Sequence, residues 1–218
     1  MIGKALAESL GTALIVATVL GAGFAQAALG AEPALGLLMI AIAVAGVLFV
    51  SISIFTPLSG SHFNPIVSLA LLAQRKLSPL ETSVYVLAQL VGALLGAVIA
   101  NLMFGSNLAI SQVSRISSGA IIGEVVASAG LVFIVLLLIH FSKQDLIAAS
   151  VALWILAGHL FTSSTAFANP AVTVGRIFST APSSISVDSS LWFILAQAIG
   201  LFVALFLFSQ LARKQDQA

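Results

Sequence analysis

Long apolar runs, separated by short stretches that contain Gly, Pro or charge, dominate this chain. Their length predicts six membrane-spanning helices, at about residues 5–28, 34–56, 79–104, 119–141, 146–163 and 190–211. Two further segments, 57–77 and 164–189, are too apolar for solvated loops and too interrupted for full spans. Lipid cannot satisfy the N–H and C=O groups of non-helical backbone, so such backbone must be enclosed by protein or line a cavity. We therefore expect both segments to re-enter the membrane around a cavity.

Each interrupted segment contains an Asn-Pro pair. The first reads His-Phe-Asn-Pro-Ile-Val over residues 62–67, and the second reads Phe-Ala-Asn-Pro-Ala-Val over residues 167–172, 105 residues later. Asparagine is favoured at the N-cap, and proline suits the first helical position because its missing N–H would have no partner there. Each motif therefore predicts the start of a half-helix.

The motifs belong to a longer internal repeat. Glu8 and Glu124 each precede an apolar helix, and an Ala-Gln pair recurs at residues 88–89 and 196–197. The repeats extend over about 1–105 and 117–212, and three spans in each half make the second half inverted relative to the first. The predicted fold is an all-α membrane protein with six transmembrane helices, two re-entrant half-helices and an inverted internal repeat, in one domain over residues 1–218.

Composition and charge agree with a membrane location. Of the 218 residues, 60% are hydrophobic and 7% are charged, far from the balance of soluble domains. No cysteine is present and no His or carboxylate pair has metal-ligand spacing, so we expect no cofactor, no metal and no nucleic-acid partner. The first run is long enough to span and contains Glu8, which favours a retained helix over a signal peptide. Six of the eight basic residues, all except Arg115 and Arg176, fall on one side of a six-span chain, which places both termini in the cytoplasm.

Paired Asn-Pro half-helices in a duplicated six-span chain resemble the aquaporin (major intrinsic protein) family along essentially the whole sequence. The run Ser-Gly-Ser-His-Phe-Asn-Pro at residues 59–65 is similar to the first pore loop of that family. The resemblance implies a membrane channel domain that assembles as a homotetramer in lipid, with one pore per subunit. It also implies a multi-pass protein of a bacterial inner (plasma) membrane that passes water and small neutral solutes.

The resemblance also assigns roles to individual residues. It places the pore centre at Asn64, Pro65, Asn169, Pro170 and Ala171, where the asparagine amides donate hydrogen bonds to the solute and two helix dipoles repel cations. It makes acceptor ladders of the backbone carbonyls of Gly60, Ser61, His62, Thr165, Ala166 and Phe167. Glu8 and Glu124 match acids that brace these loops, because a carboxylate buried in a membrane must be paired; a proton relay is the alternative.

The outer filter departs from the family pattern. Most members have an arginine immediately after the second Asn-Pro-Ala, whereas this chain has Val172. By spacing from the asparagines, the other filter positions are Val44, Ala157 and Ala166, all small and apolar. This set predicts a wider, less polar aperture for glycerol-like polyols, small amides or neutral metalloid hydroxides. The valine resembles an aquaglyceroporin-like bacterial branch associated with arsenical transport, and a strict water channel is the alternative.

Two polar residues near this filter have open roles. Arg176 lies four residues beyond Val172 on the same helix face, which predicts a cationic group in the outer vestibule; it could instead pair with Asp188 or extend to the surface. His159 lies two residues beyond Ala157, and a small register shift would bring it to the filter. There it would act as a pH gate, or it would only pack against its neighbours.

Other functional classes fit the sequence less well. Inverted repeats and broken helices also build secondary transporters, but only Glu8 and Glu124 are intramembrane groups that could couple ions. An enzyme is not expected, because no nucleophile, base and orienting group converge. A purely structural junction would leave the two midplane asparagines unexplained.

Overall fold

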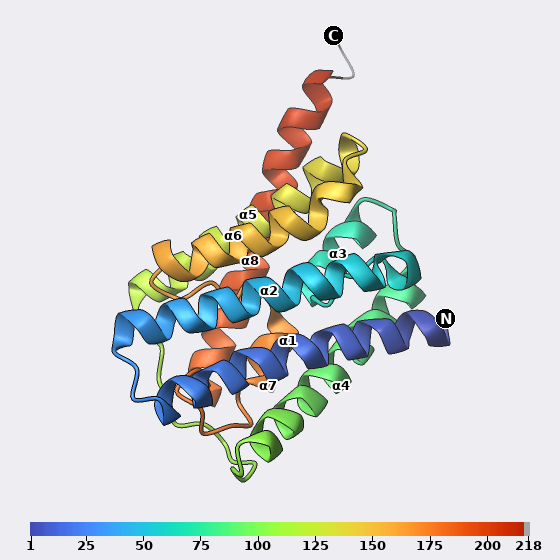
Figure 1. The fold of residues 1–218 in the computed structure, drawn as a ribbon. Coiled ribbons are helices and arrows are strands. Elements are labelled where there is room, and N and C mark those ends of the chain that lie inside the picture. Colours follow the sequence, from blue (N-terminus) through green and yellow to red (C-terminus); the bar gives the residue numbers. More distant parts are fainter. Residues whose placement is uncertain (216–218) are drawn as a thin grey trace.

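Six long helices surround two short ones in the computed structural model, which describes residues 1–215 (Figure 1). The long helices are α1 (Ile2–Ala28), α2 (Pro33–Ser59), α4 (Pro79–Met103), α5 (Ser118–His140), α6 (Ile147–Phe161) and α8 (Val187–Gln215). The short helices are α3 (Pro65–Ala73) and α7 (Pro170–Gly175), and a 3-10 turn, η1 (Gln144–Leu146), leads into α6. Six helical segments are long and apolar enough to cross a membrane, namely α1, α2, α4, α5, η1 together with α6, and α8. The predicted all-α fold with six spans and two half-helices is confirmed.

Local sequence signals account for most helix starts. Ser78 and Glu81 form a capping box at the start of α4, with Pro79 at the first helical position. Ser117 caps α5 by accepting a hydrogen bond from the N–H of Ala120. The sequence therefore specifies these two boundaries locally.

The end of α2 differs from the prediction. The sequence placed the start of a re-entrant segment at Pro57, but α2 continues through this proline to Ser59. A proline in the last turn removes only one backbone hydrogen bond, which a helix end tolerates better than a helix centre. The helix ends where Gly60 adopts a left-handed conformation with φ of 84°.

The two halves of the chain pack in the same order. In the first half α1 packs against α2 and α4, and in the second half α5 packs against α6 and α8. Contacts between α2 and α6 join the halves, and the short helices α3 and α7 contact each other at the middle of the molecule. The half-helices are thus enclosed by long helices, as non-spanning backbone in a membrane requires.

Glycines allow α1 and α4 to approach closely. A Cβ atom at Gly92 would overlap the carbonyl group of Ser9, and one at Gly96 would overlap that of Ala13. Small residues four apart permit such backbone contact between membrane helices. Gly200 has the matching position in α8, where a Cβ atom would lie 2.7 Å from the carbonyl oxygen of Val125 in α5.

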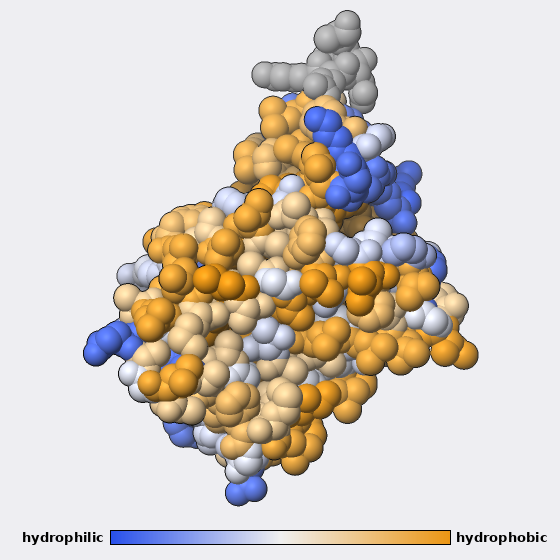
Figure 2. Space-filling view, in the orientation of Figure 1, coloured by the Kyte–Doolittle hydropathy of each residue, from blue (hydrophilic) through white to orange (hydrophobic). Residues whose placement is uncertain are grey.

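The outer faces of the long helices are apolar. Hydrophobic residues cover most of the face shown in Figure 2, and the most hydrophilic residues gather toward its edges. Exposed side chains from different helices include Leu10, Ile42, Leu87, Leu153 and Phe202. Such a surface matches lipid tails rather than water.

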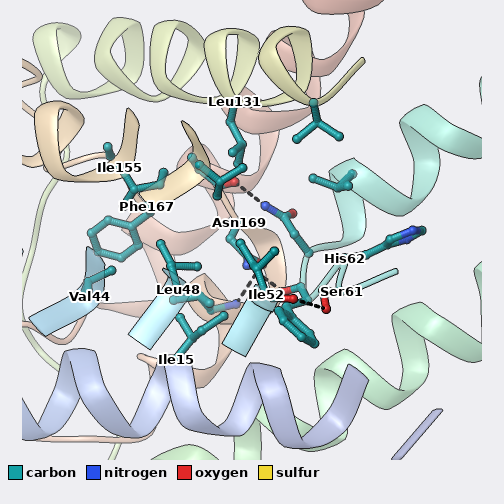
Figure 3. A pocket seen from close by; sticks show the side chains of 18 of the residues that line it. Ile15, Val44, Leu48, Ile52, Ser61, His62, Leu131, Ile155, Phe167 and Asn169 are labelled. Atoms are coloured by element: carbon teal, nitrogen blue, oxygen red, sulfur yellow. Dashed lines mark hydrogen bonds between the residues drawn. The ribbon is translucent and has the colours of Figure 1, made fainter. Parts of the chain in front are cut away.

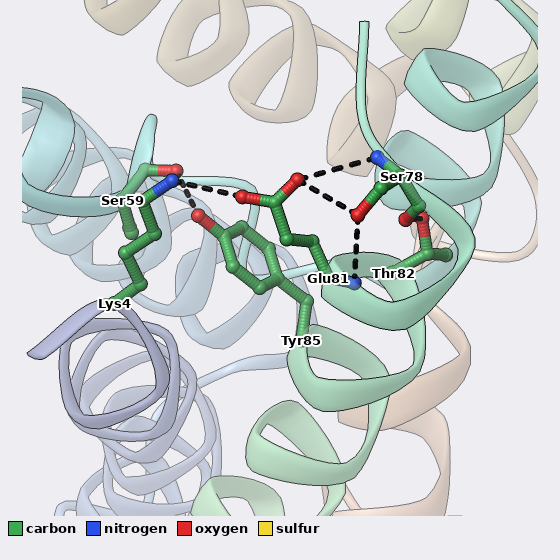
Figure 4. Close-up of polar contacts among 6 residues, drawn as sticks. All are labelled: Lys4, Ser59, Ser78, Glu81, Thr82 and Tyr85. Atoms are coloured by element: carbon green, nitrogen blue, oxygen red, sulfur yellow. Dashed lines mark hydrogen bonds and ion pairs between the residues drawn. The ribbon is translucent and has the colours of Figure 1, made fainter. Parts of the chain in front are cut away.

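Polar contacts tie three helix ends together at one edge of the molecule (Figure 4). Lys4 of α1 pairs with Glu81 of α4 at 3.0 Å, and this is the only ion pair that the described residues form. The hydroxyl of Tyr85 donates to the carbonyl of Ser59 at 2.7 Å, which fixes the end of α2 just before the first pore-loop segment.

Candidate functional site: a passage through the helix bundle

A narrow cavity lies along the centre of the helix bundle, and in α6 its lining runs from Ile147 to His159 (Figure 3). Its volume is about 90 Å³, well below the ~300 Å³ at which ligand pockets typically begin. Long helices line it with side chains spaced four apart, and therefore with one face each: Val44, Leu48 and Ile52 of α2, Leu131, Val135 and Ile139 of α5, and Ile147, Val151, Ile155 and His159 of α6. In Figure 3, Val44 and Phe167 lie toward one end, Ser61 and His62 toward the other, and Asn169 between them.

The two half-helices meet at the middle of this cavity. Asn64 caps α3 by accepting from the N–H of Ile66 at 3.1 Å, and Asn169 caps α7 by accepting from the N–H groups of Ala171 and Val172 at 3.0 and 3.2 Å. Pro65 and Pro170 occupy the first helical positions. Both positive helix ends therefore face the same point.

The asparagines also connect the halves of the chain. The amide of Asn64 donates to the carbonyl of Ala168 at 2.8 Å, and the amide of Asn169 donates to the carbonyl of Phe63 at 2.8 Å. Each amide has a second N–H, and both asparagines line the cavity. The structure thus brings Asn64 and Asn169 together at the cavity wall, and each amide uses one of its two N–H groups in these bonds.

The residue after each proline is turned away from the passage. Ala171 is fully buried in the main core cluster. Ile66 packs against Ala70, Val132 and Leu201 rather than lining the cavity. The larger side chain at residue 66 therefore does not narrow the passage.

Residues in the left-handed conformation shape the two loops before the asparagines. Positive φ values occur at Ser61, Phe63, Thr165, Ala166 and Ala168, none of which is glycine. Each such residue costs about 1–2 kcal/mol relative to ordinary backbone. The turns bring the loop backbone to the cavity wall, because Gly60, Ser61, His62, Ala166 and Phe167 all line it.

Thr165 is an exception among the residues whose backbone carbonyls were predicted as acceptors along the cavity. It is half-buried and does not line the cavity. Its N–H donates to the carbonyl of Thr162 in the turn that ends α6, so it lies before the loop reaches the wall.

Two fully buried glutamates hold the loops in this strained shape. Glu8 accepts from the N–H groups of His62 and Phe63 at 2.9 and 2.6 Å, and from the hydroxyl of Ser59 at 2.6 Å. Glu124 accepts from the N–H groups of Phe167 and Ala168 at 2.8 and 2.9 Å. Neither glutamate lines the cavity, and this geometry favours bracing over proton relay.

Two glutamines complete the brace. Gln89 donates to Glu8 at 2.8 Å and to the hydroxyl of Ser68 in α3 at 3.1 Å. Gln197 donates to Glu124 at 2.6 Å and to the hydroxyl of Thr173 in α7 at 3.0 Å. The repeated Ala-Gln pairs signalled these residues, but their link to the glutamates appears only in the structure.

Three of the four predicted filter residues line one end of the cavity, namely Val44, Ala166 and Val172. The fourth prediction was wrong: Ala157 is exposed on the outer face of α6, and Ile155 and His159 line the cavity instead. Residues two apart point to nearly opposite sides of a helix. The filter position in α6 was found by counting back from Asn169 without gaps. Such a count does not give the face of α6 that turns to the cavity, because the loop between α6 and Asn169 is not helical.

Arg176 is buried at the same end. Only 3% of its surface is exposed, it lines the cavity, and its Nε donates to the carbonyl of Ser183 at 2.6 Å. The guanidinium carbon lies 3.4 Å from the centre of the Phe167 ring. Asp188 is exposed and forms no ion pair with it in the described chain.

A second arginine contacts the same loop as Arg176. Arg115 donates to the carbonyls of Pro182 and Ser184, each at 2.7 Å, and its guanidinium carbon lies 5.5 Å from the Phe167 ring. Burial lowers the pKa of both guanidinium groups, and the charge of Arg115 lowers that of Arg176 further. Both stay protonated, because a guanidinium does not lose its proton in proteins.

Known proteins share this arrangement. A family model described as major intrinsic protein matches residues 1–164. Aquaglyceroporin AqpS of Rhizobium meliloti (strain 1021) is 39% identical over 203 residues, which cover 93% of this chain and 87% of that protein. Aquaporin TIP1-2 of Zea mays is 31% identical over 185 residues, covering 78% and 72%. The X-ray structure of the aquaglyceroporin from Plasmodium falciparum superposes with a TM-score of 0.75 over 96% of this chain and 94% of that one, at 20% identity. The chain belongs to the major intrinsic protein family.

Proposed function

We propose that the protein is a passive channel for water and for small uncharged solutes such as glycerol-like polyols and neutral metalloid hydroxides or arsenicals. The observation that carries this proposal is the passage itself, in which two asparagine amides face each other between apolar helix faces. Backbone carbonyls on one wall offer acceptors, and the amides offer donors. A neutral hydroxylated molecule can exchange its hydration for these groups.

The outer end of the passage favours solutes larger than water. Val172 replaces the bulky arginine of most family members, and Val44 and Ala166 beside the passage are also small. The relative from Rhizobium meliloti is named an aquaglyceroporin, which agrees with such an aperture. A strict water channel is the alternative.

Charged solutes are disfavoured by the walls. Among the residues of the described chain that line the passage, none is a carboxylate, and Arg176 adds a positive charge. A cation therefore meets two positive helix ends and a guanidinium without a counter-charge. Glu8 and Glu124 are occupied by loop N–H groups, which also argues against ion-coupled transport.

We also propose a homotetramer with one passage per subunit, in a bacterial inner membrane with both termini in the cytoplasm. The charge distribution supports the orientation, although the chain end at Ala218 lies outside the described residues. The cysteine-free sequence offers a direct test, because a single Gly3→Cys or Asn107→Cys would carry the only thiol. In intact cells, a membrane-impermeant thiol reagent is expected to label residue 107 and not residue 3.

The channel proposal is tested by stopped-flow measurements on proteoliposomes with water, glycerol, urea and neutral arsenous acid. All four are expected to cross faster than through protein-free liposomes. Val44→Trp, which fills the passage, is expected to lower every flux at least about tenfold, because no volume remains beside the ring. Ile42→Trp is the matched control on the outer face of α2, where the side chain is 57% exposed. Water flux alone would contradict the wide aperture, and equal effects of both variants would contradict the passage.

A further inference from the structure

A groove lies on the outside of the bundle, beside the last turns of α4. Its volume is about 390 Å³, and the six residues that line it are all hydrophobic: Leu94, Val98, Leu108, Ala109, Ile110 and Phe178. Two of them belong to α4, three to the connection between the halves of the chain, and Phe178 to the loop that follows α7. None of the six lines the passage, so the groove is a separate site.

The depth of the groove matches one leaflet of a membrane. Leu94 lies nine residues before Met103, the last residue of α4. At 1.5 Å per residue this is ~14 Å along the helix axis, about half of a hydrocarbon core that is ~30 Å thick. The groove therefore extends from near the midplane to the membrane surface at which α4 ends.

The outer face of α4 suits lipid better than a second copy of the chain. Gly92 and Gly96 are buried against α1. Contacts between membrane helices favour small residues, so a face of bulky aliphatic side chains turns to lipid. The groove continues such a face, because between residues 84 and 103 every exposed residue is large and hydrophobic: Leu87, Val91, Leu94, Leu95, Ile99, Leu102 and Met103.

The loop wall of the groove is apolar although it is not helical. Leu108 and Ile110 are 54% and 49% exposed, and no residue from 104 to 114 is charged. The backbone N–H groups of residues 108–110 have no partner within the described chain. Such N–H groups need water, whereas the side chains avoid it. The segment therefore lies at the membrane surface, with its side chains toward the hydrocarbon.

We propose that this groove binds one acyl chain of a membrane phospholipid. Water is absent from the hydrocarbon core, and an empty groove would lose the dispersion contacts that its walls offer. These walls come from three segments of the chain, so they surround a lipid tail more fully than the face of a single helix does. The proposal does not depend on which solutes cross the passage.

A lipid tail in the groove also fastens the outer loops to α4. The N–H of Ser111, next to the loop wall, donates to the carbonyl of Ile177 at 2.8 Å. The amide of Asn101 in α4 donates to the carbonyl of Phe178 at 3.0 Å. The tail therefore adds an apolar contact to loops that are otherwise joined by hydrogen bonds.

Val98→Trp tests the site by filling it. Purified protein is incubated with dioleoyl phosphatidylethanolamine in mild detergent, and native mass spectrometry counts the lipids that stay bound. The wild type is expected to keep one more lipid per subunit than Val98→Trp, because the indole ring takes the space of the tail. Val91→Trp is the matched control and should keep the wild-type number, since it adds the same ring to the same helix face outside the groove. Equal lipid counts for all three proteins overturn the proposal.

Leu108→Ala decides the question if Val98→Trp does not assemble. It shortens one wall of the groove in an exposed loop and is expected to lose the same lipid. Leu87→Ala is its control, because Leu87 is also exposed to lipid but lies outside the groove. Retention of the lipid by Leu108→Ala at the level of this control contradicts the site.

A single fluorophore identifies what covers the groove. The sequence contains no cysteine, so Ala109→Cys carries the only thiol and can be labelled with bimane. In liposomes, phospholipids brominated on the tail are expected to quench this label, and iodide in the water is expected to have little effect. Strong quenching by iodide alone would show a groove open to water, and protection from both quenchers would show a second copy seated on it. Either result overturns the proposal.

Discussion

One buried carboxylate in each half stabilises a loop whose backbone is otherwise unfavourable. In the second half, Thr165, Ala166 and Ala168 are all left-handed, at about 1–2 kcal/mol each. Glu124 offsets this cost through charge-assisted hydrogen bonds from the N–H groups of Phe167 and Ala168, worth about 1.5–3 kcal/mol each. The shape of the passage wall therefore depends on a residue that does not line it.

Glu124→Gln is expected to lower the free energy of unfolding by about 1–3 kcal/mol, because one loop N–H would face an amide NH₂ instead of an oxygen. Thermal unfolding of the detergent-solubilised protein measures the change, and solute flux should fall with it. Glu32→Gln is the control, since Glu32 is exposed at the start of α2 and its side chain makes no capping bond. Equal stability of the two variants would remove the bracing role.

The sequence predicted the residues of the centre better than those of the outer end. Asn64 and Asn169 belong to motifs with a local cause, the N-cap followed by proline, and the structure places them face to face. Loop conformations had no such signal, because Phe63 and Ala168 adopt positive φ without being glycine. The filter position was assigned to Ala157, and His159 was named only for the case of a register shift, since counting along the chain does not give the rotation of a helix.

At the scale of elements, the predicted spans agree with the observed helices within a few residues, because each apolar run is bounded by Pro, Gly or charge. The cavity-facing side of a helix was harder to predict. Along α6 apolar residues occur all round the helix, so no polar stripe marks the face that turns inward. Contacts with α2 and α5 decide that face, and these come from distant parts of the chain.

The close contact between α1 and α4 depends on glycines, which have no side chain to separate the two backbones. Gly92→Ala would place a methyl group against the carbonyl of Ser9, and overpacking of this kind costs about 1–3 kcal/mol. A lower unfolding temperature in detergent and a lower yield of assembled protein are the expected results.

Gly46→Ala provides the control for that substitution. Gly46 also lies within a long helix, α2, but nothing is within 4 Å of the position its Cβ would take. Alanine there should be neutral or slightly stabilising, because it has the higher helix propensity. Loss of stability at residue 46 equal to that at residue 92 would point to a general glycine effect rather than to the α1–α4 contact.

At the scale of the whole molecule, both halves of the chain contribute walls to the passage. Long helices from both halves and two half-helices enclose it, and no lining residue of the described chain is a carboxylate that could bind and release a coupling ion. The structure therefore favours passive diffusion over alternating access.

Solute flux is accordingly expected to rise linearly with the glycerol gradient and to stay the same when a proton or sodium gradient is imposed in either direction. Radiolabelled uptake into proteoliposomes measures both properties. Saturation at low concentration, together with acceleration by an inward proton gradient, would favour a secondary transporter instead.

The crossed amide bonds at the centre also constrain how the chain matures during synthesis. Asn64 emerges early, but the carbonyl that its amide needs belongs to Ala168, 104 residues later. Until the second half enters the membrane, the first half buries a donor with no acceptor, or keeps its loop in contact with water. Completion of the bundle is therefore a late step in synthesis. A chain truncated between the two repeats would lack the acceptor for Asn64, and we expect it to be degraded rather than to form a channel.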